Sequence, residues 1–286
     1  QLENHPWVIL TNGRLWRLYS SRVSSSSTNY FEVDLEGITD EKDPKILYFI
    51  SIFSMLSHIP KNGISDLDLI HEGGVQYATE IESDLKNKIF NEQLFLNLIR
   101  GVLNHSAGSE YSRDKLEKAK AISLKLLYRF LFIFYAESRA LLPLEHSGYE
   151  KISINSLRQR LSALEKDKEG TDCWKSIKNL FKGISKGNSA ANLPQYDGIL
   201  FEYDPEVDDL AIRNKFLVPT IRDLTEIDGK GIDYQNLGVR HLGSLYEALL
   251  EYSVKQAHTD LIRYKDEILD ASFASDLKEK PEKFIQ

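Results

Sequence analysis

Two short acid-x-Lys sequences come closest, in this chain, to the carboxylate and lysine set of a metal-dependent nuclease. They are Asp228-Gly229-Lys230 and Asp276-Leu277-Lys278. A nuclease of this kind holds Mg²⁺ through carboxylates on adjacent strands. The first sequence lies in a glycine-rich stretch and the second in a charged tail, and neither follows a strand with a partner acid. We therefore expect a loop and a tail at these positions, without a nuclease centre.

Other catalytic and cofactor motifs are also incomplete. Asn192 to Tyr196 is the nearest match to the Asn/Asp-Pro-Pro-aromatic motif that holds a flipped adenine, but it lacks the proline pair. Gly229-Lys230-Gly231 and Gly183 to Gly187 lack the Gly-Lys-Ser/Thr ending of a phosphate-binding loop. No two of the 7 histidines are four residues apart, as a zinc pair on one helix would be. The sequence thus predicts no catalytic residue, no cofactor-binding residue and no metal ligand in this chain.

Charged side chains in apolar surroundings are more informative. Arg129 and Glu137 lie within or beside the apolar run Leu126 to Ala136. A buried charge without a partner is expensive, so these two residues need an explanation. Either they belong to an internal ion-pair network that ties this segment to its neighbours, or they mark a groove that DNA or a neighbouring domain uses.

Arginines supply the candidate contacts with DNA. Arg14 and Arg17 lie on a segment in which polar and apolar residues alternate, and their guanidinium groups could contact phosphates. Arginines on an exposed strand face are also common as merely solvated groups. Together with Arg129 and Arg139 they form the set of four candidate DNA-contact residues.

Composition bounds the class of protein. The 286 residues are 42% hydrophobic and 28% charged, which is ordinary for a folded chain. The net charge of −7 argues against binding of nucleic acid by the whole surface but leaves room for a local basic patch. The single cysteine, Cys173, excludes an internal disulfide and suits a reducing cytoplasm. The apolar runs are shorter than the about 20 residues that a bilayer requires, so we expect a cytoplasmic protein outside the membrane.

The first 36 residues predict antiparallel β structure. Asn12-Gly13 separates Trp7 to Thr11 from Arg14 to Tyr19, which predicts a type I′ hairpin because both turn residues tolerate positive φ. Asn29 to Leu35 is predicted as a third strand. Three strands bury little surface by themselves, so this sheet reads as part of a larger domain.

From Asp34 onward the periodicity is helical. Asp43-Pro44 combines an N-cap with a proline at the first helical position, and it predicts a helix to about Ser57. Further helices are predicted over Ser65 to Phe90, Asn91 to Asn104, Ser112 to Leu142, Ser153 to Lys166, Thr171 to Ile184, Asp208 to Ile227 and Val239 to Tyr252.

These elements predict a mainly α chain with a small N-terminal antiparallel sheet. Four parts are expected: residues 1–36 as the end of a β domain, 37–108 as a first helical lobe, 109–255 as a second helical lobe, and 256–286 as a tail or the start of another domain.

Five segments, in order along the chain, resemble motifs of one protein family. Trp7 to Tyr19 looks like a TNG-x-x-W-x-L-Y hairpin, with Asn12, Gly13 and Trp16 at motif positions, and Tyr30 to Leu35 looks like the strand that follows it. The family is that of type IIG single-chain restriction-modification enzymes and related BREX-type phage-defence proteins with an adenine-specific DNA methyltransferase.

The helical part carries the other three resemblances. Leu127 to Pro143 is similar to the family's RLLF…YAE…LLP helix, Leu193 to Phe201 to its LP-x-Y-N-G-G-LF segment, and Leu242 to Leu250 to its LG-x-x-YE-x-LL segment. The motif positions matched there include Glu137, Gly198, Gly243, Tyr246 and Glu247. Asp197 stands where the family has Asn, and Ile199 where it has a second Gly.

The resemblance implies that the nuclease Asp and Glu-x-Lys precede Gln1 and that the methyltransferase motifs follow Gln286. The N-terminal strands then complete a restriction endonuclease-like domain, and no family catalytic residue carries over to this chain. Mg²⁺ and S-adenosylmethionine are implied for the parent enzyme, and double-stranded DNA and the flanking nuclease and methyltransferase domains are implied as partners.

The function expected on this basis is that of a non-catalytic connector, which sets the distance and orientation of the cleavage and methylation modules on DNA. Three alternatives stay open. The chain could itself grip DNA near Arg14, Arg17, Arg129 and Arg139, with an affinity that falls steeply with salt. It could be a scaffold that meets only proteins and exposes apolar patches. It could also be a complete enzyme of an unrecognised kind.

Overall fold

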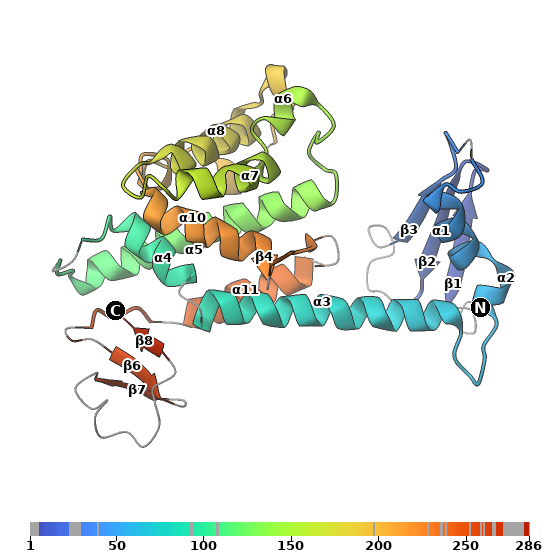
Figure 1. Ribbon diagram of the computed structural model, residues 1–286, viewed down its shortest axis with the longest axis horizontal. Coiled ribbons are helices and arrows are strands. Elements are labelled where there is room, and N and C mark those ends of the chain that lie inside the picture. Colours follow the sequence, from blue (N-terminus) through green and yellow to red (C-terminus); the bar gives the residue numbers. More distant parts are fainter. Residues whose placement is uncertain are drawn as a thin grey trace. The chain divides into compact units, whose positions relative to one another are not determined.

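The computed structural model describes residues 6–22, 30–38, 40–91, 94–106, 109–196, 198–227, 229–234, 237, 239–251, 253–257, 259, 261–264, 267–270 and 283–285. The chain is mostly helical, with a small three-stranded antiparallel sheet near its N-terminus, and this confirms the predicted fold class (Figure 1). It divides into two compact units, Gln1–Tyr77 and Ala78–Gln286. The four-part division inferred from the sequence stays a prediction.

The first unit contains the strands β1 (Trp7–Thr11), β2 (Leu15–Ser20) and β3 (Tyr30–Asp34), with β2 in the centre of the sheet. The hairpin between β1 and β2 differs from the prediction. Of the two expected turn residues, Gly13 alone has a positive φ, 92°. The backbone N–H of Asn12 donates to the carbonyl of Leu15, so the tight loop is Gly13-Arg14, and the predicted type I′ turn over Asn12-Gly13 is wrong.

The reason is the side chain of Asn12. Its Oδ1 accepts hydrogen bonds from the backbone N–H groups of Arg14 (3.1 Å) and Leu15 (2.8 Å). Asparagine often satisfies a turn in this way, through its side chain. The left-handed conformation is therefore left to glycine alone.

Helix α1 (Pro44–Phe53) packs against this sheet. Asp43 caps it as predicted, because its side chain accepts from the backbone N–H of Lys45. The ring of Trp16 on β2 makes edge contacts with Phe49 and Phe53, at centroid distances of 5.0 and 5.5 Å. The single helix expected to reach Ser57 breaks at Ser54, whose hydroxyl accepts from the N–H of Leu56 and starts α2 (Met55–His58). A serine hydroxyl competes for backbone groups in this way and favours helix ends.

The second unit is built around α5 (Arg113–Ser138). Ser112 caps this helix as predicted. Leu126, Leu127, Phe130 and Ile133 have no exposed surface, so α5 is the central buried helix that its apolar run predicts. It ends at Ser138, short of the predicted Leu142.

A left-handed residue causes that end. Ala140 has a φ of 52°, and the N–H of Leu141 donates to the carbonyl of Ala136. This backbone pattern closes a helix by satisfying a carbonyl of its last turn.

The remaining helices surround α5. They are α3 (Asp66–Asn91), which begins in the first unit, and α4 (Leu94–Val102), α6 (Ser147–Glu150), α7 (Ile154–Leu164), α8 (Asp172–Lys186), α9 (Pro205–Asp208), α10 (Asn214–Thr225) and α11 (Val239–Glu251), with the short 3₁₀ helices η1 (Ser189–Ala191) and η2 (Ile199–Phe201). Short strands follow α10 and α11: β4 (Glu226–Ile227), β5 (Lys230–Gly231), β6 (Leu261–Tyr264), β7 (Glu267–Asp270) and β8 (Lys283–Ile285).

One predicted helix, Asp208 to Ile227, is shorter in the structure, where α10 covers Asn214–Thr225 alone and Asp208 is the last residue of α9. The chain leaves helical conformation after α9 and re-enters it at Asn214. The buried amide of Asn214 donates to the carbonyls of Leu164 and Asp167 and accepts from the N–H of Cys173. These contacts pin the start of α10 to other parts of the unit, which local periodicity cannot reveal.

Several expectations fall on residues outside those described. They concern Asp197, Asp228, Asp276 to Lys278 and most of residues 256–286. In the described part of the chain, no helix has both the length and the apolar character needed to cross a membrane.

Two glycines test the packing of the second unit. A methyl group on Gly148 of α6 would overlap the backbone carbonyl of Ala190, whereas one on Gly243 of α11 would meet open space. We expect Gly148→Ala to lower the free energy of unfolding by about 1–3 kcal/mol, as overpacking does. Gly243→Ala is expected to raise it by up to about 1 kcal/mol, since alanine favours helix. Urea unfolding measures both, and equal effects of the two variants would contradict the packing at Gly148.

Candidate functional site

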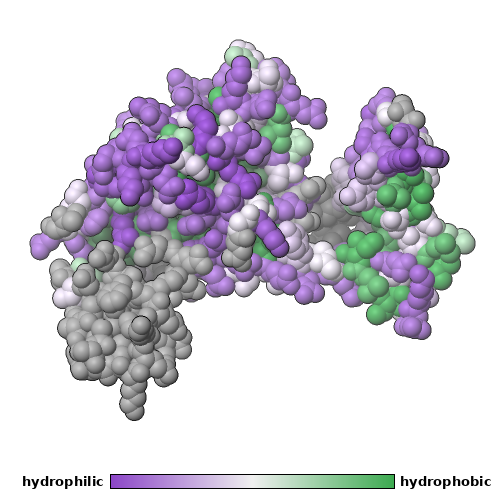
Figure 2. All heavy atoms as spheres, viewed as in Figure 1, coloured by the Kyte–Doolittle hydropathy of each residue, from purple (hydrophilic) through white to green (hydrophobic). Residues whose placement is uncertain are grey.

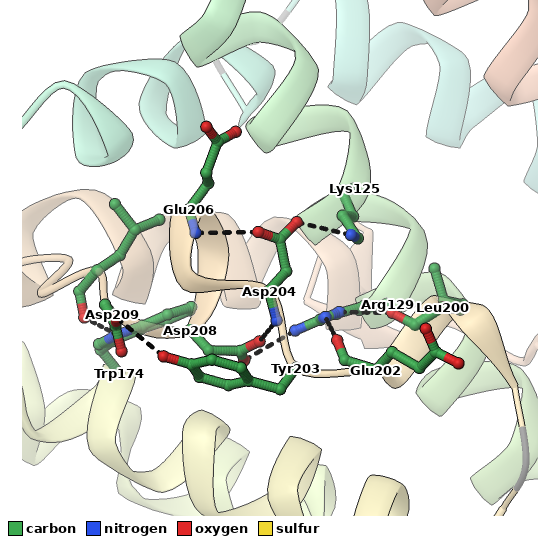
Figure 3. Close-up of polar contacts among 11 residues, drawn as sticks. Lys125, Arg129, Trp174, Leu200, Glu202, Tyr203, Asp204, Glu206, Asp208 and Asp209 are labelled. Atoms are coloured by element: carbon green, nitrogen blue, oxygen red, sulfur yellow. Dashed lines mark hydrogen bonds and ion pairs between the residues drawn. The ribbon is translucent and has the colours of Figure 1, made fainter.

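Arg129 on α5 forms the most deeply buried charged contact of the second unit (Figure 3). Its Nε donates to the carbonyl of Leu200 at 2.8 Å, and its Nη2 donates to the carbonyl of Glu202 at 2.9 Å. Its Nη1 forms an ion pair with Asp208 at 3.0 Å. The Arg129 side chain has no exposed surface, so these acceptors replace water around the guanidinium.

Aromatic rings complete the surroundings of Arg129. The guanidinium carbon lies 5.1 Å from the ring centre of Phe181 on α8 and 5.7 Å from that of Phe201 on η2. Contacts of a cation with aromatic faces are strongest where water is excluded. Arg129 is therefore a structural clamp, which ties α5 to α8 and to the segment from η2 to α9.

The acidic segment around Asp204 is itself ordered by side chains. Asp204 forms an ion pair with Lys125 at 2.7 Å, and its N–H donates to Asp208 at 2.8 Å. The hydrogen bond from Lys125 lowers the pKa of Asp204. The hydroxyl of Tyr203 donates to Asp209 at 3.0 Å. Figure 3 shows Asp208 between the Arg129 guanidinium and the Asp204 backbone, with Asp209 on the other side near Trp174, so these three carboxylates are engaged in internal contacts.

Glu137, the penultimate residue of α5, is the second buried charge. Its Oε1 accepts from the hydroxyl of Tyr149 at 2.7 Å and from the backbone N–H of Ile154 at 2.9 Å. Ile154 is the first residue of α7, so the carboxylate satisfies a backbone donor at a helix N-terminus. Desolvation raises the pKa of Glu137, although the hydrogen bonds from Tyr149 and the backbone oppose that rise.

A cleft of about 240 Å³ lies beside Glu137. Its polar lining includes Ser138, Asn155, Thr225 and Arg158. Arg158 is paired with Glu226 at 2.9 Å, so both charged side chains of the lining are engaged in internal contacts. The arrangement suits the joining of α5, α7 and α10 better than the capture of a charged ligand.

Two further candidate DNA-contact arginines, Arg14 and Arg17, are paired with carboxylates of the protein. Arg14 pairs with Asp34 at 2.8 Å and also with Glu36, and its hydrogen bond lowers the pKa of Asp34 to about 2. Arg17 pairs with Glu32 across the β2–β3 ladder. These two belong to the first unit, whereas Arg129 and Arg139 belong to the second.

Arg139 follows α5, and its guanidinium lies 5.6 Å from the ring centre of Tyr135. Its Nε is buried and has no hydrogen-bond partner among the described residues. The four arginines therefore do not form one cluster within either unit, and DNA contact by any of them stays a prediction.

The remaining motif residues lie next to η2 or within α11. Gly198 precedes η2 in extended conformation, with φ at −164°. Gly243, Tyr246 and Glu247 all lie in α11, where Glu247 is exposed. Nothing is described of the Tyr246 side chain.

No protein-family model, no curated protein and no solved structure matches this chain. Among the residues that the structure describes, no group of three or more His, Cys, Asp and Glu side chains is placed to hold a metal ion. The site is therefore characterised by its own contacts alone.

Sequence reasoning identified Arg129 and Glu137 as buried charges and offered an internal network as one explanation. The observed contacts are of that kind, although Glu137 is held by hydrogen bonds and not by a cation. It missed the partners Asp208 and Tyr149. The many acidic residues between 202 and 209 could have suggested a partner for Arg129 in that segment. No local feature of the sequence indicated Tyr149 as the partner of Glu137.

Arg129 can be tested by removing its charge. We expect Arg129→Met to lower the free energy of unfolding by about 3 kcal/mol, because it strands two carbonyls and one carboxylate. The matched control is Arg160→Met at an exposed position of α7, with an expected change within about 0.5 kcal/mol. If chemical denaturation shows the same loss of free energy of unfolding in both variants, Arg129 does not act as a clamp.

Glu137 predicts a specific pH dependence. A carboxyl whose pKa is raised by folding stabilises the protein fully below its unfolded value of about 4.3, and this contribution is lost as pH rises through the folded pKa. Relative to Glu137→Gln, the wild type should therefore lose free energy of unfolding as pH rises above about 4. Unfolding titrations across this range measure the difference, with Glu150→Gln on α6 as control. A difference that stays flat or grows in favour of the wild type would refute the prediction.

Proposed function

We propose that this chain is a non-catalytic connector of a DNA restriction-modification enzyme, which positions nuclease and adenine-methyltransferase modules on DNA. The observation that carries the proposal is an apolar surface on the first unit, where hydrophobic side chains gather in Figure 2. Large exposed apolar patches mark surfaces that other proteins cover. The flanking nuclease-like module is the occupant that we propose for it.

The patch is formed by α1 and α2. Leu47, Ile50, Met55 and Leu56 expose 66%, 54%, 75% and 67% of their surface, respectively. Burying side chains of this size is worth about 1.5–3 kcal/mol each, so leaving four of them in water is costly. This cost supports a covering partner.

The sheet offers a second surface of the same character. β1 is an edge strand, and Trp7–Thr11 carries neither a charge nor a proline. Natural edge strands that face solvent are usually protected by such residues. Val8 and Leu10 on β1 are 39% and 58% exposed. An unprotected edge supports continuation of the sheet by strands of a neighbouring module.

The second unit suits the mechanical part of the proposal. Arg129 and Glu137 fix α5 to its surroundings at two points, which favours a stiff spacer. In this proposal Mg²⁺ and S-adenosylmethionine are bound by the flanking modules, the protein is cytoplasmic, and double-stranded DNA is the common substrate.

A protein-binding scaffold is the second candidate, because it would use the same apolar patch. A grip on DNA through Arg14 and Arg17 gains no support, since both are engaged with carboxylates. The connector and the protein-binding scaffold differ in the partner that covers the apolar patch.

The test compares the chain with its parent, whose coding sequence is expected to supply an Asp…Glu-x-Lys upstream and an Asn-Pro-Pro-Tyr downstream. The double variant Leu47→Lys/Leu56→Lys should leave the melting temperature of residues 1–286 unchanged, because both side chains are exposed there. In the parent it should loosen the nuclease module, seen as faster limited proteolysis and loss of cleavage. Ile199→Lys, at an 82% exposed position of the second unit, is the control.

Stop codons just outside both ends of this segment would overturn the connector proposal. So would a parent whose nuclease module is indifferent to the double variant. A nuclease module that loosens equally with Ile199→Lys would show that the effect does not belong to the patch.

A further inference from the structure

Helix α8 (labelled in Figure 1) carries four lysines at helical spacing. Lys178, Lys182 and Lys186 follow one another at intervals of four residues, and Lys175 precedes them. Residues at spacings of three and four lie on one side of a helix. The four lysines therefore share one face, which we name the α8 lysine row.

The opposite face of α8 fixes the direction of this row. Cys173, Trp174, Ile177, Phe181 and Ile184 are each at most 2% exposed. An α-helix turns by about 100° per residue, so these buried residues lie on the side of α8 opposite the lysines. The core of the second unit thus turns the row outward, with Lys175, Lys182 and Lys186 exposed and Lys178 half-buried.

Three lysines of the row have no internal counter-charge. Within the described residues, no carboxylate forms an ion pair with Lys178, Lys182 or Lys186, whereas Lys175 pairs with Asp172 at 2.7 Å. Other lysines, such as Lys125, are paired. The row thus places three lysines that have no ion pair in the described part of the chain on one helix face of a protein whose net charge is −7.

Acidic residues in the loop before α8 do not neutralise the charge of the lysine row. In the loop between α7 and α8, Glu165 pairs with Arg222 at 2.7 Å. Glu169 pairs with Arg213 and with Lys215, also at 2.7 Å. Hydrogen bonds from these partners lower the pKa of both carboxyl groups, so both stay ionised and engaged elsewhere.

We infer that the α8 lysine row binds the phosphate backbone of double-stranded DNA. This inference deepens the proposed connector by naming where the chain itself touches DNA. Successive lysines are about 6 Å apart along the helix axis, and phosphates of one strand follow at about 3.4 Å along the duplex. Flexible lysine side chains can therefore reach every second phosphate.

The lysine chemistry also fits a sequence-independent contact. An ammonium group is a point charge on a flexible stem and lacks the fork with which arginine reads a base edge. Backbone contacts of this kind position a protein on DNA without specifying sequence. That role is the one that a spacer between two enzymatic modules requires.

The experiment uses the chain of residues 1–286 and a short fluorescein-labelled DNA duplex, with anisotropy titrations between about 50 and 200 mM KCl. The variant is Lys178→Gln/Lys182→Gln/Lys186→Gln. Each neutralised phosphate contributes about 0.9 to the slope of log affinity against log salt, so the slope should become shallower by about 2–3. Affinity at the lower salt concentration should fall at least about tenfold.

The matched control removes the same charge elsewhere. Lys42→Gln/Lys151→Gln/Lys230→Gln alters three exposed lysines outside α8 that also have no ion pair within the described residues, and it is expected to keep the slope within about 1 of the wild type. Circular dichroism and thermal melting check that both triple variants fold as the wild type does.

Three results would overturn the inference. They are salt-independent or undetectable binding of the duplex by the wild type, equal losses in the two triple variants, and tighter binding of anionic phospholipid vesicles or duplex RNA than of duplex DNA. Failure here leaves the connector proposal intact, because that proposal is judged by the apolar patch in the parent. If the Leu47→Lys/Leu56→Lys variant fails to loosen the nuclease module of the parent, DNA binding measured by anisotropy on residues 1–286 is unaffected.

Discussion

The guanidinium of Arg129 is cut off from water, and the packing of the second unit depends on how that charge is accommodated. A buried cation needs hydrogen-bond acceptors within reach. Two carbonyls and the Asp208 carboxylate supply them, and the faces of Phe181 and Phe201 close the remaining sides. All three acceptors come from residues 200–208, whose regular structure is limited to the short helices η2 and α9. Arg129 and Lys125, both on α5, hold this stretch in place through Asp208 and Asp204.

Glu137, at the other end of the apolar run, is also buried and also needs hydrogen-bond partners. It lies eight residues after Arg129, which is about 12 Å along α5, and it draws Tyr149 of α6 and the first turn of α7 onto the helix. Two buried charges of opposite sign thus fasten α5 to different neighbours. Such networks specify one arrangement of helices, because any other arrangement leaves a charge without partners. A uniquely packed unit of this kind is suited to hold other modules at a set distance.

The two units handle apolar surface and charge differently. The buried cluster of the first unit contains Leu18, Ile52 and Leu67, while Leu47 and Met55 remain in water, so this unit favours a partner. In the second unit apolar residues fill the core and the surface is organised by charge. Four arginines there are paired with carboxylates, namely Arg129, Arg158, Arg213 and Arg222, whereas Lys178, Lys182 and Lys186 of α8 have no ion pair within the described residues. This division follows from chemistry, because arginine forms fixed forks with carboxylates and lysine stays strongly hydrated.

Local signals in the sequence determined the fold class, the three strands and several helix starts. Asp43 and Ser112 were predictable as caps because the donors that they satisfy lie two and three residues away. The turn at Gly13 was placed one residue wrongly, since the Asn12 side chain took over a role expected of its backbone. The break before Asn214 and the partner of Arg129 were beyond local reasoning. Asp208 is 79 residues from Arg129 in the chain, so the sequence showed that a buried charge needs a partner but only the tertiary structure decided which carboxylate met it.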